Sequence, residues 1–157
     1  MALTLSSSAF EDGGAIPARY SCEGPNVSPP LSWRGLPDGT KSLALILDDP
    51  DAPRGLFTHW IVYNLPPDHD GLPENAAAHE VSQWGGSHGR NDFGQAAYGG
   101  PCPPRGDQAH RYYFRLYALD DRIELTAGAS RPQVLDAIRD HVLARAELIG
   151  TYARAGE

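Results

Sequence analysis

The sequence has few cationic residues and no cluster of them. Its 157 residues include 13 Lys and Arg against 20 Asp and Glu, which gives a net charge of -7. Proteins that bind nucleic acids or anionic membranes through their overall electric field normally carry a basic patch. We therefore expect no nucleic-acid partner, and any bound anion must be held by a local, preorganised site.

Long apolar runs are also absent. Unbroken apolar stretches such as LALIL, residues 43–47, fall far short of the ~20 residues that a membrane-spanning helix needs. The first residues, MALTLSSSAFEDGG, show neither the basic nor the apolar part of a secretory signal. We therefore expect no integral membrane segment and a cytoplasmic location.

Cysteine is scarce as well. Cys22 and Cys102 are the two cysteines of the chain, too few to indicate a disulfide scaffold. Their spacing does not show whether they pair with each other. Reduced thiols are the default state in the cytoplasm, so that is the state we expect.

Glycine and proline, by contrast, are frequent, and they divide the chain into short segments. The 17 Gly and 14 Pro mark many turns, and the runs between them are rich in β-branched, aromatic or leucine residues. The clearest strand candidates are residues 41–48, 58–65 and 110–120. The sequence predicts a mainly β, antiparallel fold in a single domain over residues 1–157.

The C-terminal part shows a different pattern. Apolar residues from Val134 to Ile149 recur at helical spacing, and Ser130 with Gln133 forms a capping box. Gly150 follows the last expected turn. We therefore predict one C-terminal helix over residues 130–150, packed on the β domain. A shorter helix or a loop is expected around residues 75–79.

Three of the predicted strands carry a titratable residue at one end. Side chains two residues apart share a face of a strand, which places Asp49 with the leucines at 43, 45 and 47. The same rule places His59 with Ile61 and Tyr63, and His110 with Tyr112. These faces are apolar and expected to point inward. The sequence therefore predicts a small pocket at one rim of a sheet, lined by a carboxylate, two imidazoles and a phenol.

The two carboxylates beside Asp49 are expected to have other roles. Asp48 has the opposite parity and should point away from the pocket. Asp51 lies beyond Pro50, and aspartate at such a position commonly accepts backbone hydrogen bonds in a turn. Each of these residues taken alone has an ordinary structural explanation, and the shared register of three strands favours a site.

A glycine- and proline-rich segment, GGPCPPRG at residues 99–106, precedes His110. Glycine allows backbone N–H groups to approach a ligand closely, whereas consecutive prolines remove donors and stiffen the chain. From composition alone, a ligand-binding wall and a crossover loop without a ligand are equally good explanations.

Several segments resemble the phosphatidylethanolamine-binding protein family, also called Raf kinase inhibitor-like, and its bacterial branch most closely. Two signature regions carry the resemblance: DPDAP (49–53) with HW and IVYN (59–64), and YGGPCPPRGDQAHRY (98–112). It extends over nearly the whole chain through SPPLSW (28–33), NDFG (91–94), LYALD (116–120) and LIGTYAR (148–154). The resemblance implies antiparallel Greek-key sheets and a small pocket for phosphate, acetate-like anions or phospholipid headgroups.

The resemblance also implies which residues form the pocket. By position in the motifs, the family's pocket aspartate and its two histidines correspond to Asp49, His59 and His110. The implied ligand-binding set is completed by Tyr112, Gly100, Pro103, Pro104 and, at the mouth, Tyr98. Asp51 and Arg111 match family positions too, and we expect them to support the pocket without contacting the ligand.

The chemistry of such a site follows from the pairing of a carboxylate with imidazoles. Asp49 favours a doubly protonated ring, and so prepares His59 or His110 to hold an anion. We expect the Tyr112 hydroxyl and backbone N–H groups near Gly99 and Gly100 to add donors. Affinity for phosphate should then fall as the pH rises through the histidine pKa range.

Three other interpretations stay open at this point. Asp49, His59 and His110, with or without His88, contain the donors of a metal enzyme, although no tight ligand spacing supports one. Asp49 with a histidine partner is also a candidate acid or base of a hydrolase. The third is a protein-interaction module, because some relatives inhibit kinases or proteases.

We expect a non-enzymatic protein without cofactor or metal that binds a small anion, either phosphate or a phospholipid headgroup. A kinase or protease partner and a homodimer are further options, which the resemblance implies.

Overall fold

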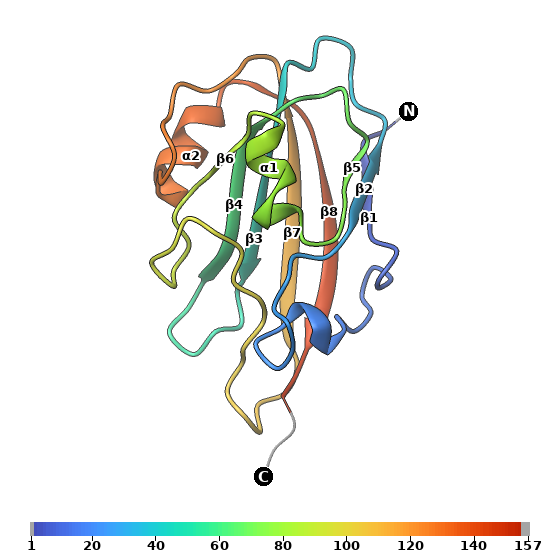
Figure 1. The fold of residues 1–157 in the computed structure, drawn as a ribbon, viewed down its shortest axis with the longest axis vertical. Helices are drawn as coiled ribbons and strands as arrows, with labels where there is room; N and C mark the ends of the chain where they lie inside the picture. The colour runs from blue at the N-terminus through green and yellow to red at the C-terminus, as the bar shows by residue number, and fades with distance from the viewer. Residues whose placement is uncertain (1, 155–157) are drawn as a thin grey trace.

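The computed structural model describes residues 2–154, so Met1 and residues 155–157 of the predicted domain lie outside the described residues. Two antiparallel sheets form this part of the chain (Figure 1). The smaller has the order β1-β2-β5, with β1 at Thr4–Ser6, β2 at Leu31–Arg34 and β5 at Gly71–Leu72. The larger has the order β6-β4-β3-β7-β8, with β3 at Ser42–Asp49, β4 at Phe57–Leu65, β6 at Ser87–His88, β7 at His110–Leu119 and β8 at Val142–Tyr152. The predicted mainly β, antiparallel fold is confirmed.

The helices are few and short. They are η1 (Ala18–Tyr20), η2 (Ala76–Ala78), α1 (Glu80–Gln83) and α2 (Arg131–Ile138). Of the two alternatives expected around residues 75–79, a short helix or a loop, the structure shows the short helix η2, which α1 follows closely. Within residues 2–154, no helix has the length and apolar character that crossing a membrane requires.

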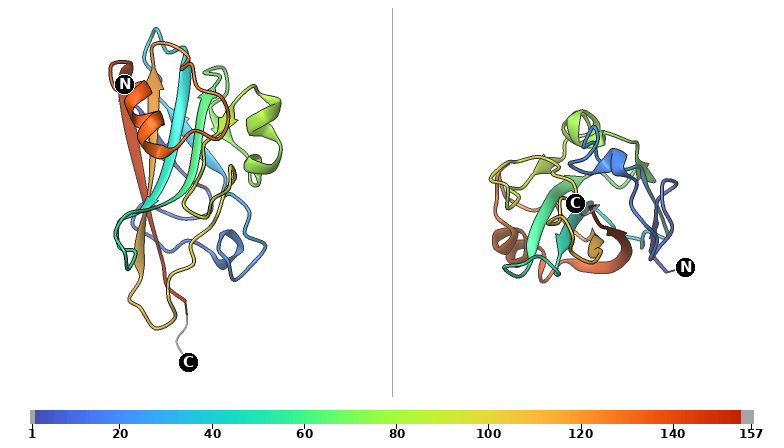
Figure 2. Two further views of the ribbon diagram at one scale, coloured as in Figure 1. Left: turned by 90° about the vertical axis from the view of Figure 1, so that its left-hand side faces the viewer. Right: turned by 90° about the horizontal axis from the view of Figure 1, so that it is seen from below.

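β3 lies in the middle of the larger sheet and is buried on both faces. Its leucines at 43, 45 and 47 pack with Leu31 and Trp33 of the smaller sheet, in the core between the two sheets. Ala44 and Ile46 pack on the other face, in a cluster with Val134 and Ile138 of α2. Figure 2 shows α2 lying beside the larger sheet. This double burial explains why the strand reads as an unbroken apolar run. The three strands predicted at 41–48, 58–65 and 110–120 are confirmed to within one residue at each end.

The predicted helix over residues 130–150 is wrong in its second half. Its start is confirmed, because the Ser130 side chain accepts the Gln133 N–H and the Gln133 side chain accepts the Ser130 N–H. The helix ends at Ile138, however, and the chain turns into β8, which pairs with β7 along its whole length.

Over this short segment, the spacing of the apolar residues fits both the 3.6-residue period of a helix and the two-residue period of a strand. Ala146, Leu148, Gly150 and Tyr152 alternate with less buried positions, which is the period of a strand. Pairing with β7 outweighs the local helical spacing, because tertiary contacts commonly override weak helix propensity. Gly150, expected as a helix terminator, lies instead in the strand, where a Cβ atom would come 2.5 Å from Ile16. Its missing side chain makes room for this contact.

Candidate functional site

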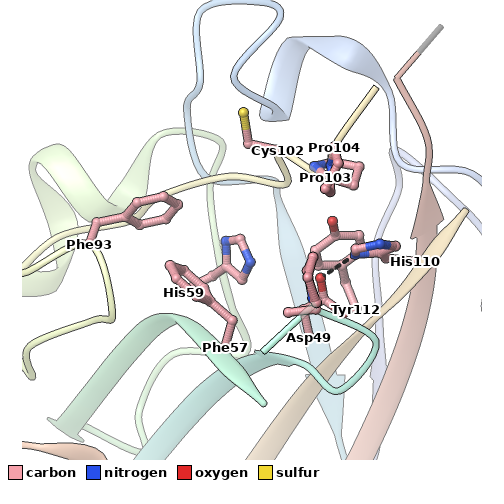
Figure 3. Close-up of a pocket in the computed structure, with 11 residues that line it drawn as sticks. Asp49, Phe57, His59, Phe93, Cys102, Pro103, Pro104, His110 and Tyr112 are labelled. Carbon is pink, nitrogen blue, oxygen red and sulfur yellow. Dashed lines mark hydrogen bonds and ion pairs between the residues drawn. The ribbon is translucent and has the colours of Figure 1, made fainter. Parts of the chain in front are cut away.

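A cavity of about 220 Å³ lies at the end of the larger sheet where β3 ends and β7 begins (Figure 3). Its polar lining consists of Asp49, His59, His110 and Tyr112. Its remaining walls are Ala52, Pro53, Phe57, Phe93, Cys102, Pro103 and Pro104. The structure therefore brings together the strand ends that the sequence placed at one rim.

His59 reaches this cavity through a bulge in β4. Leu47 pairs with Trp60 and Asp48 pairs with Thr58, so His59 is an extra residue between two regular pairs. A bulge of this kind redirects side chains and is common beside functional sites. It places Trp60 in the core between the sheets while His59 lines the cavity.

The predicted parity of His59 is therefore wrong, although its position in the pocket is not. Ile61 and Tyr63 pack on the opposite face of the sheet, in the cluster that contains Val134 of α2. Strict alternation would have turned His59 to that face as well. The bulge in β4 changes the alternation at this point, so the His59 imidazole lies on the cavity side of the sheet.

Asp49 is held entirely by donors from the protein. Its Oδ2 lies 2.7 Å from His110 Nδ1, and its Oδ1 accepts the Asp51 N–H at 2.8 Å. Asp49 and His110 are only 3% and 4% exposed. A buried carboxylate is costly unless it is paired, so this pairing positions His110 and leaves Asp49 little capacity to repel an anion.

His110 faces a second carboxylate. Its Nε2 lies 3.2 Å from Oδ2 of Asp107. Burial lowers the pKa of His110, but the hydrogen bonds with Asp49 and Asp107 outweigh burial and raise it above the ordinary value of 6.5. A ring between two carboxylates is best served by two N–H donors. His110 is therefore the cation of the site.

His59 has the opposite character. Its Nδ1 lies 2.8 Å from the carbonyl oxygen of Gly99, which can only accept, so Nδ1 carries a proton and Nε2 is the free nitrogen. Burial lowers the pKa of His59, and the hydrogen bond with Gly99 and the charge of Asp49 do not compensate for it. The charge of Asp49 favours the protonated form of both rings, but together with the hydrogen bonds it outweighs burial only at His110.

Tyr112 lies between the two imidazoles. Its ring is 5.4 Å from the His59 ring and 6.4 Å from the His110 ring, measured between centroids (Figure 3). The hydroxyl is buried and has no hydrogen-bond partner within residues 2–154. Burial is the main cause that raises the pKa of Tyr112, followed by the charge of the neighbouring Asp49 carboxylate and its hydrogen-bonding interaction with the phenol, so the phenol keeps its proton. The hydroxyl is therefore a protonated donor beside Asp49 that makes no hydrogen bond of normal distance and angle in the described residues.

The glycines before the proline wall do not supply donors. The Gly99 N–H donates to the carbonyl of His59, and the Gly100 N–H donates to Asn26 Oδ1 at 2.9 Å. The expectation that these backbone groups add donors to the pocket is therefore wrong. A Cβ on Gly99 would lie 2.4 Å from the Phe93 ring, so Gly99 gives that ring its place.

Of the other residues that the resemblance implied, some line the cavity and others do not. Pro103 and Pro104 line the cavity as expected. Gly100 and Tyr98 are not among the lining residues, and the Tyr98 hydroxyl donates to the Tyr20 carbonyl at 2.6 Å. Tyr98 thus closes the core behind the loop.

A disulfide joins Cys22, just after η1, to Cys102 in the proline loop. The expectation of reduced thiols is therefore wrong. The Cys22 N–H also donates to the Pro101 carbonyl, so the two loops are joined by a covalent bond and a hydrogen bond. Because Cys102 lines the cavity, the disulfide anchors one of its walls.

The two flanking carboxylates act as supports. Asp51 accepts three hydrogen bonds from Arg111, one from the backbone and two from the guanidinium. The hydrogen bond from the Arg111 side chain is the main cause that lowers the pKa of Asp51 to about 2. Asp48 lies on the other face of the sheet, where it accepts from Arg131 and from the Thr58 hydroxyl. The predictions for these residues agree with these contacts.

Sequence reasoning missed part of the cavity wall. Phe57 and Phe93 meet edge to face with centroids 4.8 Å apart, and Ala52, Pro53 and Cys102 complete the wall. Phe93 belongs to the NDFG motif, and Phe57 lies two residues before His59. Their closeness in sequence to these motifs was the signal that could have identified Phe57 and Phe93 as residues of the cavity wall.

Asp49, His59 and His110 line the same cavity, but they are not arranged as ligands of one metal ion. In the described residues, no group of three His, Cys, Asp or Glu side chains is close enough to hold a metal ion. His88, the optional fourth member of that set, lies on β6, next to Trp60 and outside the cavity lining.

Fold and cavity together define an antiparallel β domain with a small, partly polar pocket at the end of one sheet. The model of the family described as "Phosphatidylethanolamine-binding protein" matches residues 6–153. A UPF0098 protein of Methanothermobacter thermautotrophicus is 53% identical over 152 residues, which are 97% of this chain and 99% of the relative. The chain belongs to the phosphatidylethanolamine-binding protein family.

Two solved structures agree with this assignment. A phosphatidylethanolamine-binding protein homolog from Chlamydia trachomatis is 45% identical, with a TM-score of 0.89 over 98% of each chain. YbcL of Escherichia coli, a member of the mammalian family by its description, is 35% identical, with a TM-score of 0.90 over 98% of this chain and 99% of its own. The fold is therefore shared with bacterial members of the family.

Proposed function

We propose that this chain is a non-enzymatic protein that binds a small anion, either phosphate or the phosphate of a phospholipid headgroup. The observation that carries the proposal is the buried, protonated hydroxyl of Tyr112, which has no acceptor within residues 2–154. A buried donor without a partner costs stability, and a ligand in the cavity that accepts from the Tyr112 hydroxyl would remove this cost.

The charges around the hydroxyl favour an anion. His110 is the cation, and Asp49 is already neutralised by it and by the Asp51 N–H. The free Nε2 of His59 becomes a further donor whenever that ring is protonated. Phe57, Phe93 and the prolines keep much of the wall apolar, which strengthens hydrogen bonds to a charged ligand.

No observation favours the hydrolase alternative. Asp48, Asp49 and Asp51 do not face one another, because each is engaged by its own partners: Arg131, His110 and Arg111 respectively. Paired acid–base catalysis needs two carboxyl groups that share one reacting centre. We therefore keep binding, and not catalysis, as the proposed activity.

The affinity for sulfate should fall as the pH rises. Sulfate is the suitable probe because its own charge is constant through the neutral range. The pKa of His110 lies above 6.5 and that of His59 below it. As the pH rises, His59 therefore loses its proton first and His110 loses its proton at a higher pH. We expect the dissociation constant to increase by about tenfold between about pH 6 and about pH 9, since a hydrogen bond to a charged group is lost.

Isothermal titration calorimetry at constant ionic strength measures this dependence. Phosphate and phosphoethanolamine, titrated at one pH, distinguish a free anion from a headgroup as the preferred ligand. An affinity for sulfate that is independent of pH over this range would contradict the role of the imidazolium.

The setting of this activity is part of the proposal. A cytoplasmic location, a homodimer and a kinase or protease partner stay predictions. Disulfides such as Cys22–Cys102 are more typical of oxidising compartments than of the cytoplasm of most organisms, so the location needs its own test by fractionation.

A further inference from the structure

We propose that Asp107 is an internal competitor for the anion site, whose carboxylate occupies the N–H of His110 that an anionic ligand would otherwise take. The inference rests on the proposed function and deepens it. It names the residue that sets how strongly an external anion must bind.

The hydrogen bonds of His110 carry the argument. Nδ1 lies 2.7 Å from Asp49 Oδ2 and Nε2 lies 3.2 Å from Asp107 Oδ2. Both ring nitrogens therefore face carboxylates of the protein, and the cation of the site has no donor left for a ligand. Unless one carboxylate leaves, an anion can bind directly only to Tyr112 and, when the His59 ring is protonated, to His59 Nε2.

The two carboxylates differ in how easily they can leave. Asp49 ends β3, is 3% exposed and also accepts the Asp51 N–H. Moving it would strand a buried charge. Asp107 is 43% exposed at its side chain, and its contact with His110 is the single side-chain hydrogen bond that it makes in the described part of the chain. When it swings away it returns to water, so the exchange costs little.

The position of Asp107 fits this role. Its N–H donates to the carbonyl of Pro104, a residue of the cavity wall, so Asp107 lies where the loop closes over the edge of the cavity. It follows Gly106, whose φ of +88° belongs to the left-handed region that favours glycine. His110 itself lines both the cavity and a shallow outer depression that contains Asp107 and Arg111.

Asp107→Asn removes the charge while it keeps the size of the side chain. If the Asp107 carboxylate contacts His110 most of the time, it weakens the apparent affinity for sulfate. The factor is about the ratio of the population in which Asp107 contacts His110 to the population in which it does not. The Asp107–His110 ion pair is partly exposed, and such pairs are weak, so we expect this ratio to be small. Sulfate should then bind about three- to tenfold more tightly to Asp107→Asn. We expect this gain for sulfate at a pH well below the ordinary histidine pKa of about 6.5, where the hydrogen bond with Asp49 still favours the protonated ring in the variant.

Asp38→Asn is the matched control. It removes the same unit of charge from an exposed residue before β3, at the end of the strand opposite Asp49. Calorimetry with sulfate should show that Asp38→Asn binds like the unmodified protein and that Asp107→Asn binds more tightly. If the unmodified protein binds sulfate and Asp107→Asn binds it equally or more weakly, the inference fails and the proposed function stands. If none of the three proteins binds sulfate, the proposed function fails, and the inference fails with it.

A second measurement does not need a ligand. The groups that face His110 are Asp49, Asp107, the Asp51–Arg111 pair and Tyr112. Removing the charge of Asp107 should lower the pKa of His110, which nitrogen-15 NMR of the ring follows directly. An unchanged pKa would show that the carboxylate does not engage the ring in solution, and would overturn the inference.

Discussion

Tyr112→Phe will weaken the binding of sulfate or phosphate by about ten- to a hundredfold, because a hydrogen bond to a charged group is worth about 1.5–3 kcal/mol. The same substitution will raise the free energy of unfolding of the ligand-free protein by up to about 1 kcal/mol. It removes a buried hydroxyl that has no partner in residues 2–154, and such a group costs stability. The two effects have opposite signs, which a purely structural tyrosine would not show.

Tyr63→Phe is the control for this prediction. The Tyr63 hydroxyl donates to the Thr126 carbonyl on the α2 side of the sheet, away from the cavity. Its loss should lower the free energy of unfolding by about 1 kcal/mol and leave the affinity unchanged. Calorimetry and urea denaturation of the two variants measure both quantities. Unaltered affinity in Tyr112→Phe would remove the main support for the anion site.

The double substitution Cys22→Ser/Cys102→Ser will lower the free energy of unfolding by about 4 kcal/mol. The disulfide closes a loop of 80 residues, and a cross-link across so long a segment strongly restricts the unfolded chain. The bond also anchors the cavity wall at Cys102, so we expect weaker sulfate binding in the variant as well.

Treatment of the unmodified protein with a dithiol reductant provides the comparison for the disulfide. The reduced protein and the double variant should unfold at the same denaturant concentration, below that of the oxidised protein. A difference of less than about 1 kcal/mol between oxidised and reduced forms would contradict the stabilising role of the cross-link.

The β fold could be predicted because its strongest signals are local. β3, β4 and β7 combine β-branched, aromatic or leucine residues with turn residues at their ends, and these features do not depend on distant parts of the chain. The second half of the C-terminal segment was predicted wrongly for the opposite reason. Whether residues 142–152 form a helix or a strand is decided by pairing with β7, which local spacing does not contain.

The sequence could predict which residues form the site, but not how their side chains are oriented or charged. Asp49, His59 and His110 were found from strand ends and motifs, but the register of His59 depends on a bulge that alternation cannot reveal. The difference between the two histidines was equally hidden. Burial lowers the pKa of both rings, and the hydrogen bonds with Asp49 and Asp107 outweigh it only at His110, which requires the folded chain.

The central claim is that the cavity beneath the proline loop holds an anion between Tyr112, His59 and His110. A crystal structure of the protein soaked in phosphate, and of a second crystal soaked in phosphoethanolamine, tests it most directly. The account predicts tetrahedral density in the cavity, within hydrogen-bond distance of the Tyr112 hydroxyl and of His110 Nε2, with the Asp107 carboxylate displaced from that nitrogen and His59 Nε2 facing the anion. An anion bound elsewhere on the protein, with the Tyr112 hydroxyl still lacking an acceptor, would contradict it.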